Sequence, residues 1–237
     1  MIRIEPVSET NAIIYLGDEI DLALTPQIGE LTVFLTRLNP EAIVEVIPSY
    51  TSVLVQFRPQ LMTHAELKQA IEGFKARLSM ATNSTGSPVP KGKLIELPVY
   101  YDLETGPDLQ LIADAKGISV TQVIETHSKQ DYTVCAIGFA PGFAFLASVD
   151  EAIATPRHST PRKRLPAGSV GIANSQTAVY PADSPGGWQI IGNCPLSLFN
   201  PDSTPMSPFN VGDTVRFLPI SREKFIEQGG EIWPDWK

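Results

Sequence analysis

The sequence is poor in the residues that build metal and redox sites. Its 237 residues include only two cysteines, Cys135 and Cys194, which lie far apart and outside any Cys-x-x-Cys spacing. This argues against a thioredoxin-type motif and a cysteine-based zinc site, so we expect two buried, reduced thiols. The three histidines form neither a His-x-His nor a His-Glu-x-x-His pattern. No metal site is predicted.

Long apolar runs and known nucleotide-binding loops are also missing. No segment approaches the roughly 18 apolar residues of a membrane-spanning helix, and the N-terminal MIRIEPVSET does not resemble a signal peptide. Neither Gly-x-x-x-x-Gly-Lys-Ser/Thr nor Gly-x-Gly-x-x-Gly occurs. A net charge of −8 argues against a broad basic face for nucleic acid or anionic membranes. We therefore expect a cytoplasmic protein that binds neither nucleic acid nor membrane.

The composition that remains is that of a globular protein. Hydrophobic residues make up 43% of the chain and charged residues 19%, which allows an ordinary buried core. Most of the 21 prolines follow residue 80. Because proline is excluded from helix interiors and central strands, this favours short strands and turns in the second part of the chain.

The first 80 residues alternate between strand and helix patterns. Strands are expected at residues 3–7, 12–17, 43–48 and 52–57, and helices at 25–39 and 63–78. Thr63 and Glu66 have the spacing of a capping box at the start of the second helix. Residues 1–80 are therefore predicted to form a small α+β domain. Residues 81–93, rich in Ser, Thr, Gly and Pro, are predicted to be a linker.

Residues 94–237 are predicted to form a mainly β domain. Short strands separated by Pro and Gly turns are expected at residues 94–101, 132–139, 168–174, 177–181, 187–192, 196–200 and 213–219, with short helices at 108–116, 119–128 and 221–230. Ser119 and Gln122 have capping-box spacing. Many short strands at this spacing indicate a closed or nearly closed barrel.

One stretch of this acidic chain is free of carboxylates, from Ala152 to Ala182, and it contains TPRHSTPRKRLPAG. Prolines stiffen this loop, and the arginine fork suits carboxylates and phosphates. We predict that Arg157, Arg162 and Arg164 bind an anion and lack acidic partners of their own. The alternative is a solvated basic surface loop, and His158 is expected to be a surface histidine.

Two glycine-rich segments flank this stretch. GFAPGFAFL contains a Pro-Gly turn, and is either an apolar pocket wall or a turn with core phenylalanines. SPGGWQIIG exposes backbone N–H groups that suit an anion, and its tryptophan is either core or pocket wall. The predicted pocket wall consists of Phe139, Pro141, Gly142, Phe143 and Trp188.

His127 ends a predicted helix, where its charged form would be favoured by the helix dipole. We treat it as a possible acid or base. A catalytic triad is defined by geometry, so none is predicted from the sequence.

Four ordered motifs, GFAPGFAFL, ATPRHSTPRKRLPAGSVGIA, QTAVYPADSPGGWQIIG and PLSLF, resemble the KipI or allophanate hydrolase subunit 1 family. The resemblance covers nearly the whole chain. Bacterial members of this family include the B subunits of ATP-hydrolysing 5-oxoprolinases. The resemblance implies a C-terminal barrel of cyclophilin-like type.

The resemblance also implies a function. It predicts one subunit of an enzyme complex that opens the lactam of 5-oxoproline to L-glutamate with ATP hydrolysis, and that is inactive alone. ATP with Mg would be the co-substrate of the complex. The implied partners are the C subunit, which is of the allophanate hydrolase subunit 2 type, and the A subunit. The alternatives are a KipI-like module that inhibits a sensor histidine kinase, and a carboxyltransferase-type domain acting in urea or amide carboxylation.

On the positions that match these motifs, we assign roles from the chemistry of the residues. The three arginines would bind phosphate or the substrate carboxylate, and backbone donors would stabilise oxyanion charge. The substrate and anion site is predicted to consist of Arg157, Arg162, Arg164, Gln176, Tyr180, Ser184, Gly186 and Gly187. We expect the joint replacement of Arg157 and Arg162 by alanine to abolish activity while leaving the fold intact.

Overall fold

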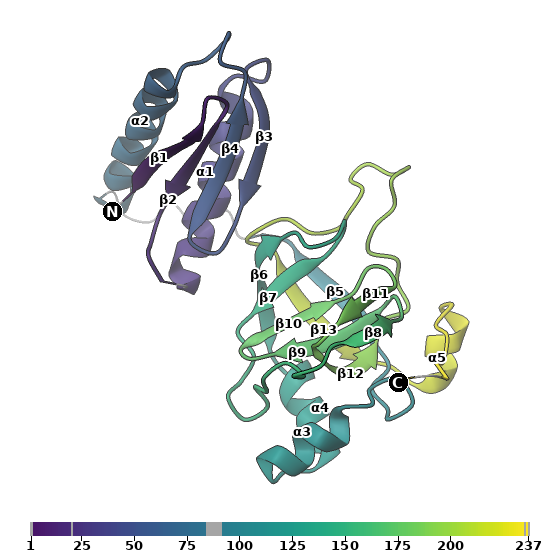
Figure 1. Ribbon diagram of the computed structural model, residues 1–237. Helices are drawn as coiled ribbons and strands as arrows, with labels where there is room; N and C mark the ends of the chain where they lie inside the picture. The colour runs from purple at the N-terminus through teal and green to yellow at the C-terminus, as the bar shows by residue number, and fades with distance from the viewer. Residues whose placement is uncertain (1, 20, 84–91, 235, 237) are drawn as a thin grey trace. The chain divides into compact units, whose positions relative to one another are not determined.

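The chain divides into two compact units, residues 1–91 and 92–237. The computed structural model describes residues 2–19, 21–83, 92–234 and 236 (Figure 1). Most of the predicted linker, residues 84–91, lies outside the described residues. Residues 81–83, also assigned to that linker, instead belong to the last turn of a helix.

The first unit is built on a four-stranded antiparallel sheet with the order β1-β2-β4-β3. The strands are β1 (Arg3–Ser8), β2 (Asn11–Tyr15), β3 (Ile43–Pro48) and β4 (Ser52–Phe57). Burial alternates along β2 and β4, so one face of the sheet contributes Ala12, Ile14, Val53, Val55 and Phe57 to the core. This alternation confirms the predicted strands.

Two helices complete the first unit, α1 (Thr25–Leu38) after the short 3-10 turn η1 (Leu22–Leu24), and α2 (His64–Asn83). Ile28, Leu31 and Leu35 of α1 are fully buried. Phe34 of α1 stacks on Phe74 of α2 with ring centroids 5.1 Å apart. The predicted capping box of α2 is present, because the Thr63 N–H donates to Glu66 and the Glu66 N–H donates back to Thr63 Oγ1.

The second unit is a nearly closed barrel of seven strands with the order β12-β9-β10-β7-β6-β13-β5 (Figure 1). The edge strands β5 and β12 meet through two backbone hydrogen bonds between Tyr100 and Asn193, 2.9 and 3.0 Å long. The strands are β5 (Leu94–Val99), β6 (Asp131–Ile137), β7 (Ala144–Ala147), β9 (Ser169–Ala173), β10 (Gln176–Val179), β12 (Gln189–Asn193) and β13 (Thr214–Pro219). The predicted barrel is therefore confirmed in its coarse form.

A separate two-stranded ribbon joins β8 (Arg162–Leu165) to β11 (Ser184–Gly186). Part of the basic stretch is thus a strand, where the sequence predicts a loop. The predicted strand at residues 196–200 is wrong, since these residues form no strand. Pro195 and Pro201 flank it, and each removes a backbone donor that a ladder needs.

Three helices accompany the barrel: α3 (Leu109–Lys116), α4 (Val120–Ser128) and α5 (Arg222–Glu227). In Figure 1, α3 and α4 lie together at one end of the barrel. Ser119 and Gln122 form the predicted capping box of α4. Both cysteines are buried and unbridged, which confirms the prediction.

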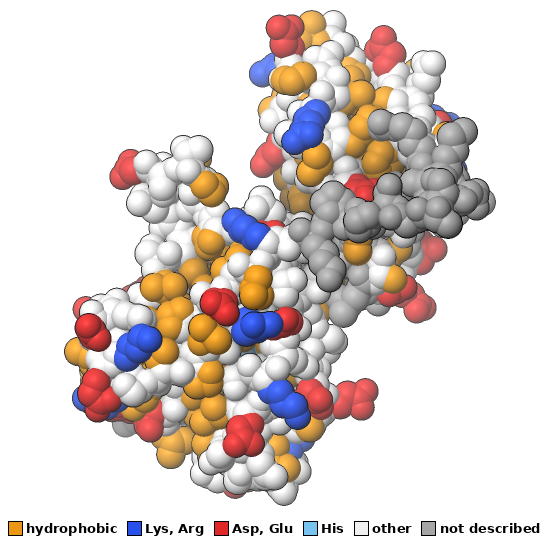
Figure 2. Space-filling view, turned by 180° about the vertical axis from the view of Figure 1, so that it is seen from behind, with side chains coloured by type: hydrophobic (Ala, Val, Ile, Leu, Met, Phe, Trp, Pro, Cys, Tyr) orange, Lys and Arg blue, Asp and Glu red, His pale blue; other side chains and the backbone are white. Residues whose placement is uncertain are grey.

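On the face drawn in Figure 2, Lys and Arg side chains of the barrel unit are interspersed with Asp and Glu. No helix in the described part of the chain combines the length and apolarity that crossing a bilayer requires.

Candidate functional site

The basic segment, residues 155–164, is fixed to the barrel at both ends. At its start, the Asn174 N–H donates to the Thr155 carbonyl at 2.8 Å, which ties the segment to the turn between β9 and β10. At its end, Arg162 and the residues that follow pair with β11. The segment is therefore held in place by backbone contacts as well as by its prolines.

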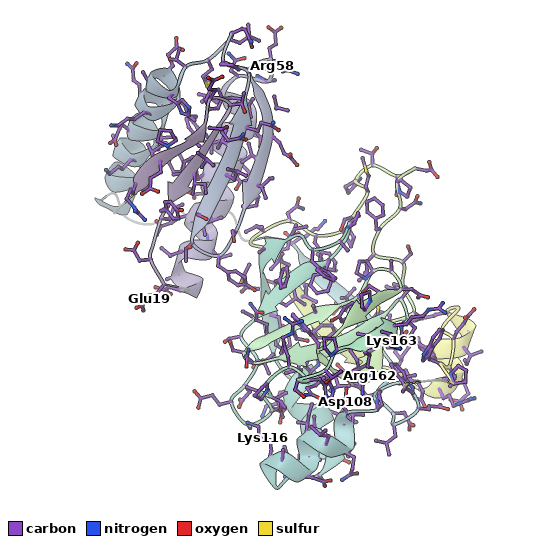
Figure 3. All side chains as sticks on the ribbon, in the orientation of Figure 1. Glu19, Arg58, Asp108, Lys116, Arg162 and Lys163 are labelled. Atoms are coloured by element: carbon purple, nitrogen blue, oxygen red, sulfur yellow. The ribbon has the colours of Figure 1, made fainter. Side chains whose placement is uncertain are left out.

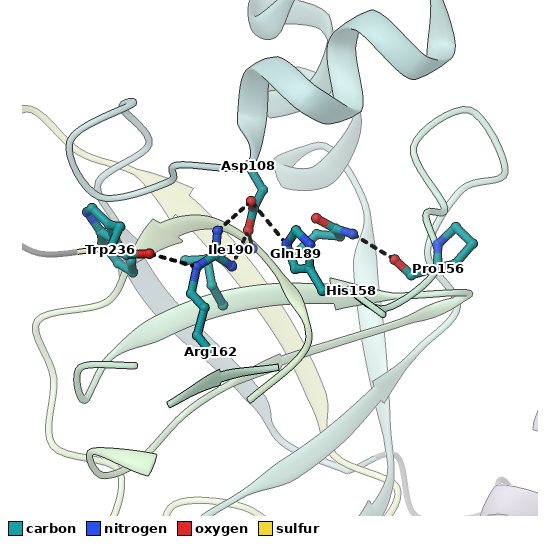
Figure 4. A network of polar contacts seen from close by, with 7 residues as sticks. All are labelled: Asp108, Pro156, His158, Arg162, Gln189, Ile190 and Trp236. Carbon is teal, nitrogen blue, oxygen red and sulfur yellow. Dashed lines mark hydrogen bonds and ion pairs between the residues drawn. The ribbon is translucent and has the colours of Figure 1, made fainter. Parts of the chain in front are cut away.

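Arg162 points at the carboxylate of Asp108, a residue for which the sequence predicts no role in the site. Its Nη1 and Nη2 donate to Oδ2 and Oδ1 of Asp108 at 2.9 and 2.7 Å (Figures 3 and 4). Its Nε donates to the Trp236 carbonyl at 3.2 Å. Only 16% of the Arg162 side chain and 4% of the Asp108 side chain are exposed. The prediction that Arg162 lacks an acidic partner is wrong, because Asp108 reaches it from far along the chain.

Asp108 connects three parts of the barrel. Besides Arg162, it accepts a 2.6 Å hydrogen bond from the Ile190 N–H in β12. His158 Nε2 lies 3.1 Å from Asp108 Oδ1, at ion-pair distance but without the alignment of a hydrogen bond (Figure 4). With 23% of its side chain exposed, His158 packs into this network. It is not the surface histidine that the sequence predicts.

Arg164 is also neutralised, but at the surface. Its Nε and Nη2 both donate to Asp183 Oδ2, at 2.9 and 2.5 Å, and its guanidinium lies 4.6 Å from the centre of the Trp233 ring. The two side chains of this pair are 62% and 42% exposed. Asp183 also accepts from the Ala167 N–H. The predicted lack of an acidic partner is therefore wrong for Arg164 as well.

Arg157 differs from both. It is exposed and forms no ion pair with any residue in the described ranges. Its neighbours on both sides are anchored, because Gln189 Nε2 donates to the Pro156 carbonyl at 2.8 Å and the His158 N–H donates to the Gly187 carbonyl at 2.7 Å. The backbone of Arg157 is thus fixed, while its positive charge is not paired with a carboxylate of the described residues.

An aromatic cluster lies beside this cation. Phe143 makes edge-to-face contacts with Phe139, Tyr180 and Trp188, with centroids 5.2, 5.4 and 5.9 Å apart. Phe143 and Trp188 are buried in a small core cluster, so they are core residues and not an exposed pocket wall. Phe139 is different, since 67% of it is exposed and its φ of 73° is unusual for a residue with a Cβ.

Tyr180 links the aromatic cluster to Arg157. Burial raises the pKa of the Tyr180 hydroxyl to about 12, and the nearby Arg157 charge and a hydrogen bond from the Trp188 backbone partly offset that rise. The phenol therefore stays protonated at neutral pH. Tyr180 is therefore a neutral group near Arg157.

Two of the predicted glycines are needed for close packing. A Cβ on Gly186 would lie 2.5 Å from the Tyr180 hydroxyl oxygen, and one on Gly142, whose φ is +81°, would lie 2.6 Å from the Leu198 carbonyl. These close approaches explain both glycines without an anion. Gly187 is buried, but a Cβ there would lie at ordinary van der Waals distance from its neighbours, 3.6 Å from the Arg157 side chain, so packing does not require this glycine.

The remaining predicted residues lie around the same region of the barrel. Gln176 is partly buried and begins β10, two residues after the turn that holds Thr155. Pro141 is exposed beside Gly142. Ser184 Oγ in β11 and Gln189 Oε1 in β12 are buried without a hydrogen-bond partner among the described residues.

His127 is not a charged helix end. It is fully buried, and its ring nitrogens contact the Tyr101 hydroxyl at 2.8 Å and Thr177 Oγ1 at 2.9 Å. Burial lowers the pKa of His127 to about 3. The sequence correctly predicts a helix end at this position but does not show that the ring lies inside the barrel core. There, desolvation of the charged ring outweighs the favourable effect of the helix dipole. His127 is neutral and structural.

The arrangement is suited to binding a small carboxylate with an apolar body. It offers the guanidinium of Arg157, which is unpaired among the described residues and stands on a fixed backbone, and the exposed aromatic ring of Phe139. Within the part of the chain that the structure describes, no three His, Cys, Asp or Glu side chains gather in a way that could hold a metal ion. The anion-binding role of Arg157 stays a prediction, and no role was predicted for Asp108, which pairs with Arg162.

Residues 2–209 match the family described as carboxyltransferase domain, subdomain C and D. The 5-oxoprolinase B subunit of Bacillus subtilis (strain 168) is 35% identical over 228 residues, which cover 94% of this chain and 95% of that protein. The protein of the same name from Escherichia coli O157:H7 is 39% identical over 214 residues, covering 90% and 94%.

A solved protein and a longer enzyme are similar over most of this chain. The crystal structure of TTHA0988 superimposes with a TM-score of 0.78 at 29% identity and covers 99% of this chain, which spans only 41% of the TTHA0988 chain. The urea amidolyase of Saccharomyces cerevisiae is 24% identical over 242 residues, and the match covers 88% of this chain but 13% of that enzyme.

Proposed function

The chain belongs to the family of carboxyltransferase domains, subdomains C and D, and we propose that it is the B subunit of a 5-oxoprolinase. Its similarity to proteins of that name extends over nearly their whole length. The complex would open the lactam of 5-oxoproline to L-glutamate with hydrolysis of ATP. We further propose that the barrel is of cyclophilin-like type. A carboxyltransferase role is less well supported, since the urea amidolyase is a distant relative.

The observation that carries the proposed site is the state of Arg157. It is the arginine of the basic segment whose charge meets no carboxylate in the described ranges, while Arg162 and Arg164 are already paired. 5-Oxoproline is a small ring that bears one carboxylate. A charge-assisted, bidentate hydrogen bond from Arg157 would hold that carboxylate.

The exposed ring of Phe139 would contact the apolar edge of the same substrate. Phe139 stands next to Phe143 and Tyr180, with centroids 5.2 and 6.4 Å away, so its ring is supported from one side and open on the other. A positioned carboxylate and a positioned ring together fix the orientation of the lactam, which lowers the entropic part of the barrier.

ATP with Mg is proposed as a co-substrate of the whole complex. The sequence has no phosphate-binding glycine loop. We propose that the complete active site is shared with the partners, the A subunit and the C subunit, the latter of the allophanate hydrolase subunit 2 type. This chain would therefore be inactive alone.

Reconstitution tests this function. The chain is co-expressed with its A and C partners, and 5-oxoproline-dependent ATP hydrolysis is measured with each of the three proteins omitted in turn. The proposal predicts that activity disappears when this chain is left out. Full activity without it would refute an enzymatic role and favour the alternative of a module that regulates a histidine kinase.

A further inference from the structure

Asp108 occupies a helix start but does not cap its helix. It precedes α3 with φ −97° and ψ −1°, and its side chain accepts no hydrogen bond from the first turn. Aspartate at this position ordinarily caps the first turn and so stabilises the helix. The carboxylate instead leaves its own helix and turns toward the basic segment and β12.

The contacts of this carboxylate reach two residues that follow Arg157 in the segment and one residue of β12. His158, directly after Arg157, lies 3.1 Å from Oδ1. Arg162, at the end of the segment, forms two hydrogen bonds to Asp108. The Ile190 N–H donates to Oδ2 at 2.6 Å, and the Asp108 N–H donates to the Ile190 carbonyl at 3.0 Å. One buried carboxylate therefore joins the segment to the barrel wall (Figure 4).

β12 and a residue just before it also hold the segment. Gln189, next to Ile190, donates to the Pro156 carbonyl, directly before Arg157. Gly187 accepts from the His158 N–H. The backbone of Arg157 is thus fixed before and after the residue, while its own guanidinium makes none of these contacts. A cation held in this way binds its anion with little loss of conformational entropy.

We infer that Asp108 is a positioning residue that sets the place of Arg157 in the binding site. It touches neither substrate nor reacting atoms, and acts through His158, Arg162 and Ile190. The inference rests on the proposed role of Arg157 in binding the substrate carboxylate.

The test compares Asp108→Asn with Asp131→Asn. Asparagine keeps the size and one acceptor, but it turns an N–H donor toward the Arg162 donors and removes the charge. Asp131 also forms two hydrogen bonds to an arginine, Arg216, at 2.7 and 2.9 Å, on β6 and β13, but both of these side chains are exposed. It therefore controls for the loss of an aspartate–arginine pair that leaves the basic segment untouched, and not for the loss of a buried charge.

The first measurement is hydrogen exchange on the full-length chain. In Asp108→Asn, amides of residues 155–162 are expected to exchange at least about tenfold faster, since their opening becomes easier. Asp131→Asn should leave them unchanged. Gln189→Met, which frees the Pro156 carbonyl without a change of charge, provides a second variant if Asp108→Asn does not fold. Unchanged exchange at residues 155–162 in the folded variants would overturn the inference.

The second measurement is a double-mutant cycle in the reconstituted complex. Asp108→Asn should raise the KM for 5-oxoproline by about tenfold or more, as a small misplacement of a binding group does. In an Arg157→Ala background, the same change should have no further effect. If Asp108→Asn raises the KM for 5-oxoproline by the same factor in the parent and in the Arg157→Ala background, the inference is overturned. If Arg157→Ala alone leaves KM unchanged, the proposed role of Arg157 fails, and the exchange result decides the positioning by itself.

Discussion

Removing Arg162 should destabilise the barrel much more than removing Arg164, although both arginines form two hydrogen bonds to an aspartate. In Arg162→Ala, the Asp108 carboxylate, which is 4% exposed in the parent chain, would lose its cationic partner and keep only the Ile190 N–H and the contact to His158. Breaking a buried ion pair by removing one partner costs about 3–5 kcal/mol. The exposed Arg164–Asp183 pair should contribute only about 0–1 kcal/mol.

The three tryptophans make this difference measurable in one unit. Trp188, Trp233 and Trp236 all belong to residues 92–237, so tryptophan fluorescence in urea follows the barrel and not the first unit. For a slope of about 2 kcal/mol per molar urea, the Arg162→Ala midpoint should fall by about 2 M. The Arg164→Ala midpoint should fall by no more than about 0.5 M.

A double variant distinguishes the effect of leaving Asp108 without a cationic partner from the effect of losing the packing of the Arg162 side chain. Replacing both members, with Asp108→Leu and Arg162→Met, removes the unpaired charge and should recover part of the stability. Recovery should be incomplete because the Ile190 N–H then lacks its acceptor. Equal midpoints for Arg162→Ala and Arg164→Ala would refute the reasoning. The result also tests the expectation that Arg162 can be replaced with the fold intact, because the buried pair with Asp108 predicts a loss of stability instead.

Two further predictions follow from buried titratable groups. The pKa of His127 is lowered from 6.5 to about 3, so the unfolded chain takes up a proton below pH 6.5 that the folded chain refuses. The free energy of unfolding should therefore fall as pH drops from about 6.5 toward 3, by at most about 1.4 kcal/mol per pH unit from this group. Over the same pH range, the urea midpoint of His127→Gln should fall less steeply than that of the parent chain. Equal pH slopes for the two chains would contradict this. Burial raises the pKa of Cys194 to about 11, so a disulfide reagent at pH 8 should label neither Cys194 nor the buried Cys135 until urea is added. Rapid labelling of the native chain would contradict that.

Local sequence patterns were enough for most of the elements. The apolar stripe of α1, the alternation in β4 and both capping boxes are set by residues within a few positions of one another, so they are readable without the fold. β8 gave no such signal. Its residues RKRL carry three cations and no alternation, and the strand exists because β11 pairs with it from about 20 residues away.

The site was predictable only in outline for the same reason. The acid-free composition of residues 152–182 is a property of the sequence, but the acid that neutralises Arg162 lies 54 residues away at the start of α3. The sequence predicted Asp108 only as the first residue of a short helix. Similarly, the spacing that placed His127 at a helix end held no information about the barrel core that surrounds its ring.

The central claim is that Arg157 binds the carboxylate of the substrate, and the KM for 5-oxoproline in the reconstituted complex tests it most directly. Arg157→Ala should raise that KM by about tenfold or more, the loss expected for one charge-assisted hydrogen bond, while the KM for ATP and the urea midpoint stay close to the parent values. Arg164→Ala, whose charge is already paired with Asp183, serves as the control and should leave the KM for 5-oxoproline unchanged. An unchanged KM in Arg157→Ala, or an equal rise in both variants, would contradict the account.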